Sequence, residues 1–507
     1  MQENIEISIF DSSMPRVIFF IIVLFFSQSF GLENMRCGTV RFLENLKNPQ
    51  KRMLAKAGCI PENLYGEVYS KKTQNFIIFY TKSGPHAIRS NEFIDSLASF
   101  LEQAYNMHKN TLGMKDISGT RITYQYRQNV PDGLYPIEVI DTGLLRGEEG
   151  DYAQTFGITF PPNGIKPKET QIIIENDFSY GADCSGNPSR LHFISKDVDY
   201  YEDWKLILKA TTFHELYHAF QSLYYNWVRY NTFWMEASAA GVEEIGVPDV
   251  NDYINYLSYN FRNPGKSMET IEHGSLEEYG WAAFYLFLYS QIDSRFDSAI
   301  WTYFSKYPTD NFAMQLARLV DSLQKKQGFN KNAADLFHEY AKQVFYSGKR
   351  IEFSPYEPFW DDMPKWPNWR VNTKVPSVLQ PGTIDFIRTT DEPNTNFAKK
   401  TLLKYNDSLV WVLTRLLEKE PEEQPEPPEI TAKKFAAFPN PWNPKSLKKV
   451  YFGTLPKNSN GVEIRSSNGA LIARVDSLWE PKKIPAPGIL YYRALPYGKN
   501  KVLIVQY

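Results

Sequence analysis

The chain has 507 residues, of which 43% are hydrophobic and 22% are charged, a composition that excludes a disordered or fibrous protein. Its formal net charge is −2, so no basic field attracts it to nucleic acid or to anionic lipid. The length allows about three domains. The three cysteines exclude a disulfide scaffold and a cysteine-ligated zinc module.

Residues 1–31 predict a secretory signal peptide. The apolar run over 17–26, about ten residues, is too short to span a bilayer, and the small and polar residues that follow it end at Gly31. Translation begins at either Met1 or Met14. We therefore expect a secreted or cell-surface protein that has no stable membrane span after signal cleavage.

The pattern after this segment predicts a mixture of strands and helices. Ser90 is an N-cap candidate, and apolar residues spaced three and four apart predict a helix over 90–113. Strands followed by many helices indicate an α+β domain, which we place at 32–375. The predicted strands are 75–81, 120–126, 135–141, 170–177 and 190–195. The later helices are 203–226, 233–246, 252–261, 277–290, 296–304, 311–325 and 333–346.

The composition changes after residue 375. Short strands with Pro and Gly turns predict a small β module over 376–417. The Pro- and Glu-rich run 418–431 cannot bury a core and predicts an extended linker. Five short strands predict a β-sandwich within 432–507. The expected fold is thus an α+β domain, with an N-terminal mixed sheet and a mainly helical part, followed by small all-β modules.

One predicted helix carries the sequence KATTFHELYHAFQSLYY over 209–225. His214 and His218 lie one helical turn apart, so both rings can reach one metal ion. Glu215 is placed to hold the water beside that metal and to act as general base. With seven histidines, a chance HExxH has a probability on the order of one in a hundred. The alternative is two structural histidines on a core helix, and a third ligand separates the two interpretations.

Glu236 is the third-ligand candidate, because a catalytic zinc needs three protein ligands and one open position. It follows His218 by 18 residues, a gap that suits a turn and a second helix folding back. The small residues 237–241 would let the two helices approach closely. Glu243 lies on the same face and is suited to orient a ligand histidine. Glu244 competes for either role.

The HELYH motif, followed by Trp-Met-Glu-Ala-Ser-Ala over 234–239, resembles the gluzincin pattern of zincins related to thermolysin and the aminopeptidases. This resemblance implies a zincin-like fold and Zn²⁺ as cofactor. The implied zinc ligands are His214, His218 and Glu236. The implied general base is Glu215.

Gluzincins also use a downstream tyrosine or histidine to stabilise the oxyanion, and Tyr279 and His273 are the two candidates here. The order of segments before and after the motif resembles that of secreted bacterial metalloproteases that often end in a type IX secretion sorting domain. The Pro-Asn-Pro-Trp-Asn-Pro run at 439–444 and the closing strands at 488–495 and 501–506 are similar to such a domain. This similarity implies the type IX secretion machinery as a partner.

The sequence therefore predicts a secreted zinc metallopeptidase that hydrolyses a peptide or protein substrate by a metal-activated water, with Glu215 as base. The alternative function is a non-catalytic surface-displayed binding protein or adhesin whose metal site is structural or vestigial. Glu215 favours the enzyme, because a purely structural site needs no base.

Overall fold

The computed structural model describes ten ranges of the chain up to residue 418 and seven short ones beyond it. The first set is 66–142, 146–147, 150–151, 155–160, 169–179, 194–195, 198–224, 233–272, 274–327 and 329–418. The second set is 437–438, 450–452, 461–467, 470–475, 478–481, 488–494 and 501–505. The predicted signal segment 1–31, the three cysteines and nearly all of the predicted linker 418–431 lie outside the described residues. In these ranges no helix is both long and apolar enough to cross a membrane.

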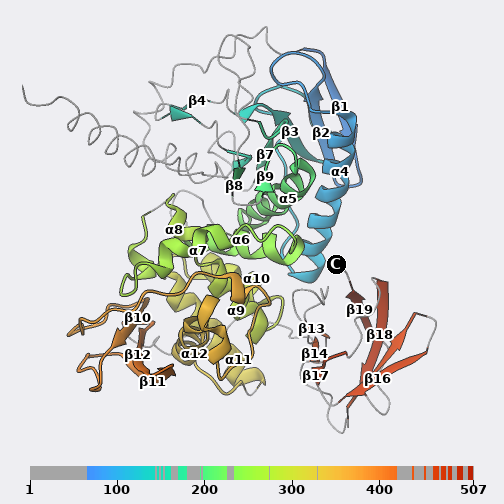
Figure 1. Ribbon diagram of the computed structural model, residues 1–507. Helices are drawn as coiled ribbons and strands as arrows, with labels where there is room; N and C mark the ends of the chain where they lie inside the picture. The colour runs from blue at the N-terminus through green and yellow to red at the C-terminus, as the bar shows by residue number, and fades with distance from the viewer. Residues whose placement is uncertain are drawn as a thin grey trace, which may run out of the picture. The chain divides into compact units, whose positions relative to one another are not determined.

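The N-terminal part contains a mixed sheet of five strands (Figure 1). The strands are β1 (Val68–Lys72), β2 (Phe76–Thr81), β3 (Tyr135–Ile140), β6 (Gly157–Phe160) and β7 (Gln171–Glu175). Their order is β1-β2-β3-β7-β6. The three central strands are parallel to one another, whereas β1 and β6 run antiparallel to their neighbours at the two ends of this order.

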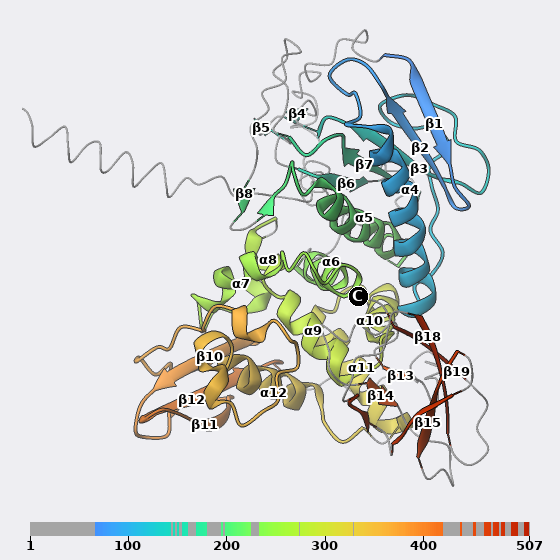
Figure 2. The ribbon, with the colours of Figure 1, turned by 45° about the vertical axis from the view of Figure 1, so that its right-hand side comes forward.

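Both faces of this sheet are covered, which explains why β2, β3, β6 and β7 are buried at nearly every position, whereas β1 is mostly polar and partly exposed. Phe76 and Ile78 of β2 belong to the main core, which they share with helices α4 (Asn91–Asn106) and α5 (Trp204–Gln221). Ile77 and Phe79 point to the opposite face and belong to a second core. Figure 2 shows α4 and α5 packed beside the sheet. The sheet therefore provides a fixed support for α5, the helix that carries the HExxH motif.

The start of α4 confirms the predicted cap. The Ser90 Oγ accepts a hydrogen bond from the Phe93 backbone N–H at 3.2 Å, which satisfies one of the free donors of the first helical turn. Phe93, Leu97 and Leu101 are fully buried, as the three- and four-residue spacing predicts. The helix continues into a π-helical turn over Met107–Thr111.

The predicted strand at 120–126 is wrong, because this segment is a loop with isolated bridges only. The cause is a fully buried carboxylate on β3, that of Glu138. The backbone N–H groups of Gln125 and Tyr126 donate to this carboxylate instead of to a neighbouring strand. A buried carboxylate must be satisfied by donors, and the loop supplies them. Of the predicted strand 190–195, only β8 (Ile194–Ser195), paired with β9 (Val198–Asp199), lies within the described residues.

The middle of the chain is helical, in agreement with the sequence. Its helices after α5 are α6 (Phe233–Gly246), α7 (Ile254–Phe261), α8 (Leu276–Tyr279), α9 (Ala282–Gln291), α10 (Phe296–Lys306), α11 (Phe312–Gln327) and α12 (Ala333–Phe345). The single helix predicted over 277–290 is divided into α8 and α9 around Gly280. A Cβ at Gly280 would lie 2.8 Å from the backbone O of Tyr256 and 2.6 Å from Asn260 Nδ2, so only glycine allows α7 to approach this closely.

The later part of the chain forms small antiparallel sheets. One sheet consists of β10 (Thr383–Arg388), β12 (Ser408–Arg415) and β11 (Lys399–Tyr405), in that order. It packs on α12, where His338 makes hydrogen bonds of 2.7 Å with the hydroxyls of Thr401 and Thr414. The remaining strands are β13 (Ala437–Phe438), β14 (Val450–Phe452), β15 (Val462–Ser466), β16 (Leu471–Val475), β17 (Leu478–Trp479), β18 (Gly488–Ala494) and β19 (Lys501–Val505). The mixed sheet, the helical middle and these sheets together give the expected α+β layout.

Candidate metal centre

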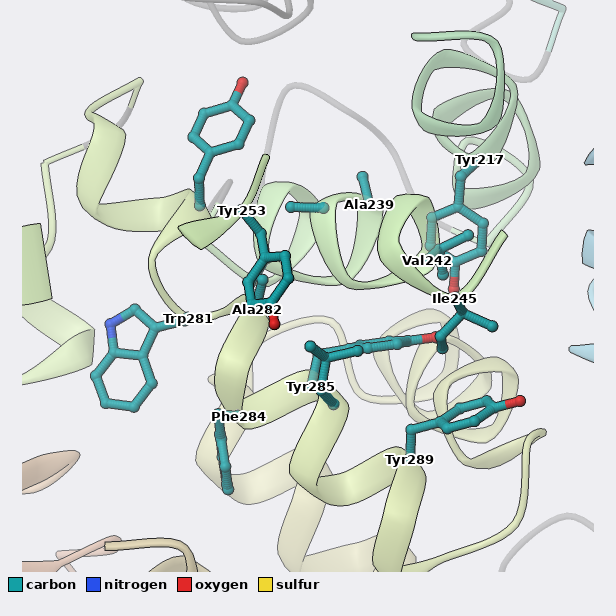
Figure 3. Close-up of a cluster of buried hydrophobic side chains, with 14 of the residues drawn as sticks. Tyr217, Ala239, Val242, Ile245, Tyr253, Trp281, Ala282, Phe284, Tyr285 and Tyr289 are labelled. Carbon is teal, nitrogen blue, oxygen red and sulfur yellow. The ribbon is translucent and has the colours of Figure 1, made fainter. Parts of the chain in front are cut away.

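The candidate site lies between α5 and α6, which pack directly against each other. Close contact is possible because α6 is rich in small residues. Gly246 at its end lies against the ring of Phe213, and a Cβ at this position would be only 2.2 Å from that ring. Every residue of α6 is buried. Figure 3 shows Val242 and Ile245 of α6 beside Tyr217 of α5. Glycine at position 246 therefore allows α5 and α6 to pack closely.

The three predicted ligands converge at this contact. The Nε2 atoms of His214 and His218 are 3.1 Å apart. The carboxylate of Glu236 presents one oxygen to each histidine, Oε2 at 3.2 Å from His214 Nε2 and Oε1 at 3.4 Å from His218 Nε2. All three side chains are at least 94% buried. In the described part of the chain, no other group of three His, Cys, Asp or Glu side chains converges as a metal site would require.

The donor spacing fits a zinc ion. Zinc lies about 2.0–2.1 Å from nitrogen and oxygen ligands in a tetrahedral site, so its ligand atoms are about 3.3 Å from one another. The three measured separations, 3.1, 3.2 and 3.4 Å, are close to that value. In addition, Glu236 Oε1 has no hydrogen-bond donor among the described residues, although it is buried. A cation between the three side chains would satisfy this oxygen.

The electrostatics of the site favour positive charge between the ligands. Burial alone raises the pKa of Glu236, but the adjacent His218 and His214 outweigh it and lower that pKa below its ordinary value. Burial alone lowers the pKa of His214, and the carboxylates of Glu236 and Glu243 reverse this effect and raise it. A metal cation would replace the protons that the carboxylates now attract to the histidines.

Each histidine has a second partner that orients its ring. Glu243 Oε2 lies 3.4 Å from His214 Nδ1, the position expected of an orienting carboxylate. The Nδ1 atom of His218 is 2.8 Å from Gln221 Oε1. The Gln221 amide in turn donates to the Met235 carbonyl at 3.1 Å, which ties it to α6. The sequence reasoning missed Gln221, although its position three residues after His218 on the same helix is a usable signal.

Glu244, the other third-ligand candidate, faces away from the histidines. Its Oε1 accepts a hydrogen bond from Trp360 Nε1 at 3.2 Å. Burial and the neighbouring Asp362 raise the pKa of Glu244 well above its ordinary value. Of the three glutamates weighed from the sequence, Glu236 is therefore the one adjacent to both histidines, and Glu243 touches one of them.

Glu215 is buried beside His214 and is held by strand β6. The Thr159 hydroxyl lies 2.8 Å from Glu215 Oε2 and 2.7 Å from its backbone oxygen. Two residues earlier, Gly157 leaves room for the same side chain, because a Cβ there would be 2.4 Å from Glu215 Cγ. No pattern in the sequence pointed to either residue, since both lie more than 50 positions before Glu215 and reach it only through the fold.

A pocket adjoins the site on the side of Glu215. Its wall includes His214, Glu215, Glu243 and the rings of Tyr256 and Tyr279. The ring of Tyr279 stacks on that of His214, with centroids 5.9 Å apart and an interplanar angle of 16°. Of the two oxyanion candidates, Tyr279 is thus placed at the pocket, whereas His273 lies outside the described residues.

The chain matches no protein-family model, and no curated protein or solved structure is significantly similar to it. The function is therefore argued from the geometry and chemistry of this site.

Proposed function

We propose that the chain is a zinc-dependent peptidase with a zincin-like fold. The observation that carries this proposal is the convergence of His214, His218 and Glu236 at the donor spacing of a tetrahedral zinc site. The buried carboxylate of Glu215 lines the pocket beside these ligands. Three protein ligands leave one position open for water, as in catalytic zinc sites, whereas structural zinc sites usually have four protein ligands.

The metal, Glu215 and Thr159 then have separate roles in the hydrolysis of the peptide bond. Zinc, when bound, supplies a Lewis acid that lowers the pKa of water from about 16 towards 7 and polarises the scissile carbonyl. Glu215 accepts the proton that the attacking water loses and delivers it to the amine nitrogen as the C–N bond breaks. The products are a carboxylate and an amine, and Glu215 returns to its ionised form. Thr159 keeps the carboxylate of Glu215 in one orientation during these transfers.

The position of β6 supports a peptide as the substrate. This strand is at one end of the strand order in the described sheet, and it carries both Gly157 and Thr159, the two residues that contact Glu215. An extended peptide can add to the edge of a sheet through main-chain hydrogen bonds. A peptide paired with β6 would pass directly by the base.

We also propose, on the sequence alone, that residues 1–31 direct export and that 432–507 form a sorting domain recognised by the type IX secretion machinery. The chain would then act outside the cell or at its surface. The described strands of this region belong to small antiparallel sheets, which are compatible with such a domain.

The direct test is chelator-sensitive hydrolysis. Purified protein should contain one zinc per chain, cleave casein or a mixed peptide library, lose this activity with a zinc chelator and regain it when zinc is restored. Glu236→Ala should lose the metal. Zinc-loaded protein that cleaves no substrate would instead favour the non-catalytic binding protein. Full hydrolysis by metal-free protein would overturn the proposed mechanism.

A further inference from the structure

Another buried carboxylate lies behind the candidate metal site, that of Asp297 on α10. This side chain is fully buried. Its Oδ1 accepts a hydrogen bond from Trp234 Nε1 at 2.7 Å, and its Oδ2 accepts from the Tyr217 hydroxyl and from Trp301 Nε1, the latter at 3.1 Å. Among the described residues its hydrogen-bond partners are these three neutral donors. Burying a carboxylate costs free energy unless hydrogen-bond donors satisfy it. The three donors therefore stabilise the Asp297 carboxylate at this buried position.

The first two donors belong to the helices that carry the predicted ligands. Tyr217 is on α5 and precedes His218 by one residue. Trp234 is on α6 and precedes Glu236 by two residues. The two oxygens of one carboxylate therefore bind α5 and α6 at the level of the metal site, one oxygen to each helix. Figure 3 shows Tyr217 directed from α5 towards Tyr285 of α9, on the far side of α6.

Two further contacts fix the positions of these donors. The indole of Trp234 stacks on the ring of Phe312, with centroids 4.0 Å apart and an interplanar angle of 23°. The ring of Tyr217 packs edge-on against that of His108, with centroids 5.1 Å apart and an interplanar angle of 64°. Because the rings of Trp234 and Tyr217 are both packed, a shift of α5 relative to α6 lengthens a hydrogen bond to Asp297.

We infer that Asp297 is a positioning residue: by binding α5 and α6 through Tyr217 and Trp234, its carboxylate sets the distance of Glu236 from His214 and His218. This inference rests on the proposed function, since it assigns Asp297 to the metal site of that function. The residue does not touch the metal ligands, and it acts through the two helices. Replacing Asp297 should therefore weaken zinc binding more than another substitution in the same core that lowers the melting temperature equally.

The test compares Asp297→Asn with Trp301→Phe. Asn has the shape of Asp, but its amide nitrogen must replace one of the two oxygens. In place of Oδ1 it faces the Trp234 N–H and removes the bond to α6, and in place of Oδ2 it is repelled by the Trp301 N–H and weakens the bond to Tyr217 of α5. Trp301 bonds Asp297 from the same helix, α10, so its replacement removes a buried hydrogen bond without separating α5 from α6. Zinc dissociation constants are measured by competition with a chromophoric chelator, and the melting temperature of each variant is recorded alongside.

The expected result is a zinc dissociation constant raised about tenfold or more in Asp297→Asn, with Trp301→Phe within about twofold of wild type at a similar loss of melting temperature. The visible spectrum of the cobalt-loaded protein should change in the first variant only. If Asp297→Asn does not fold, Tyr217→Phe, which removes only the hydroxyl, should raise the constant in its place.

Equal zinc affinities in the two variants would overturn the inference and would leave the proposed function unaffected. Wild-type protein that binds zinc but hydrolyses nothing would overturn the proposed function and leave the inference in place. Wild-type protein that binds no zinc would overturn both.

Discussion

The hydroxyl of Thr159 lies 2.8 Å from the carboxylate of Glu215 and 2.7 Å from its backbone oxygen. Strand β6, at one end of the sheet, is thus hydrogen-bonded directly to the HExxH helix α5. This contact joins two parts of the molecule that the sequence keeps more than 50 residues apart. It places the proposed general base beside β6, the strand that we propose pairs with a peptide substrate.

Replacing Thr159 should therefore affect the chemical step and leave zinc binding unchanged. In Thr159→Val the hydroxyl is lost and the shape is retained, so the Glu215 carboxylate loses a bond that fixes its orientation. A hydrogen bond to a charged group contributes about 1.5–3 kcal/mol, and we expect kcat to fall roughly 10- to 100-fold. The matched control is Thr159→Ser, which keeps the hydroxyl and should remain near wild type. Equal rates in the two variants would show that this bond has no role in the reaction.

A methyl group at position 157 should displace the base by steric contact. In Gly157→Ala the added Cβ would lie 2.4 Å from Glu215 Cγ and 2.9 Å from Thr211 Cγ2, both within the buried site. Such overpacking costs typically about 1–3 kcal/mol of stability, and the displaced carboxylate should lower kcat about tenfold or more. Zinc content, measured by elemental analysis, should stay at one per chain. Wild-type kcat in this variant would mean that Glu215 does not act from its observed position.

The two adjacent glutamates of α6 should behave differently. Glu243→Gln removes the charge beside His214 Nδ1 and should weaken zinc binding about 10- to 100-fold, as loss of an orienting carboxylate does elsewhere. Glu244→Gln is the matched control, because Glu244 faces Trp360 rather than a histidine, and its zinc affinity should match wild type. Chelator competition measures both. The reverse order of effects would assign the orienting role to Glu244.

Acid should destabilise the fold through buried neutral histidines, and His338 provides a test. Burial, with smaller contributions from Lys342 and Lys399, lowers the pKa of His338 to about 4. Below its ordinary value of 6.5 the unfolded chain takes up a proton that the folded chain does not, so stability should decline as pH falls from about 6.5 to about 4. A pKa lower by one in the folded state than in the unfolded state changes the free energy of unfolding by about 1.4 kcal/mol.

The comparison for this prediction is His338→Gln, whose amide can still make hydrogen bonds with the hydroxyls of Thr401 and Thr414. Unfolding free energies measured by urea titration should depend less on pH in this variant over the same window. His86 and His108, whose pKa values burial lowers to about 4 and about 3, remain in both proteins and contribute equally. Identical pH profiles would show that folding does not lower the pKa of His338.

The sequence predicted the parts of this fold that depend on local periodicity. The Ser90 cap is confirmed, and the helix predicted over 203–226 exists as Trp204–Gln221. Prediction from the sequence failed where a group distant in the chain determined the local structure. The segment 120–126, rich in β-branched and aromatic residues, remains a loop because the Glu138 carboxylate takes its backbone donors. Strands β1 and β11 were not predicted at all.

The same distinction applies to the candidate site. His214 and His218 could be paired from their spacing on one helix, and Glu236 from a plausible helix-turn-helix gap. Thr159 and Asp297 could not be found in this way. Thr159 contacts Glu215 from β6, and Asp297 contacts Tyr217 and Trp234 from α10. Residues that orient a site from remote elements leave no local pattern in a single sequence.

The most direct test of the central claim is the rate of peptide hydrolysis per bound zinc in wild type and in Glu215→Gln. If Glu215 is the general base of a zinc site formed by His214, His218 and Glu236, the variant should retain one zinc per chain and lose hydrolysis by at least about 100-fold. A Glu215→Gln protein that carries its zinc and cleaves peptides at the wild-type rate would contradict the account.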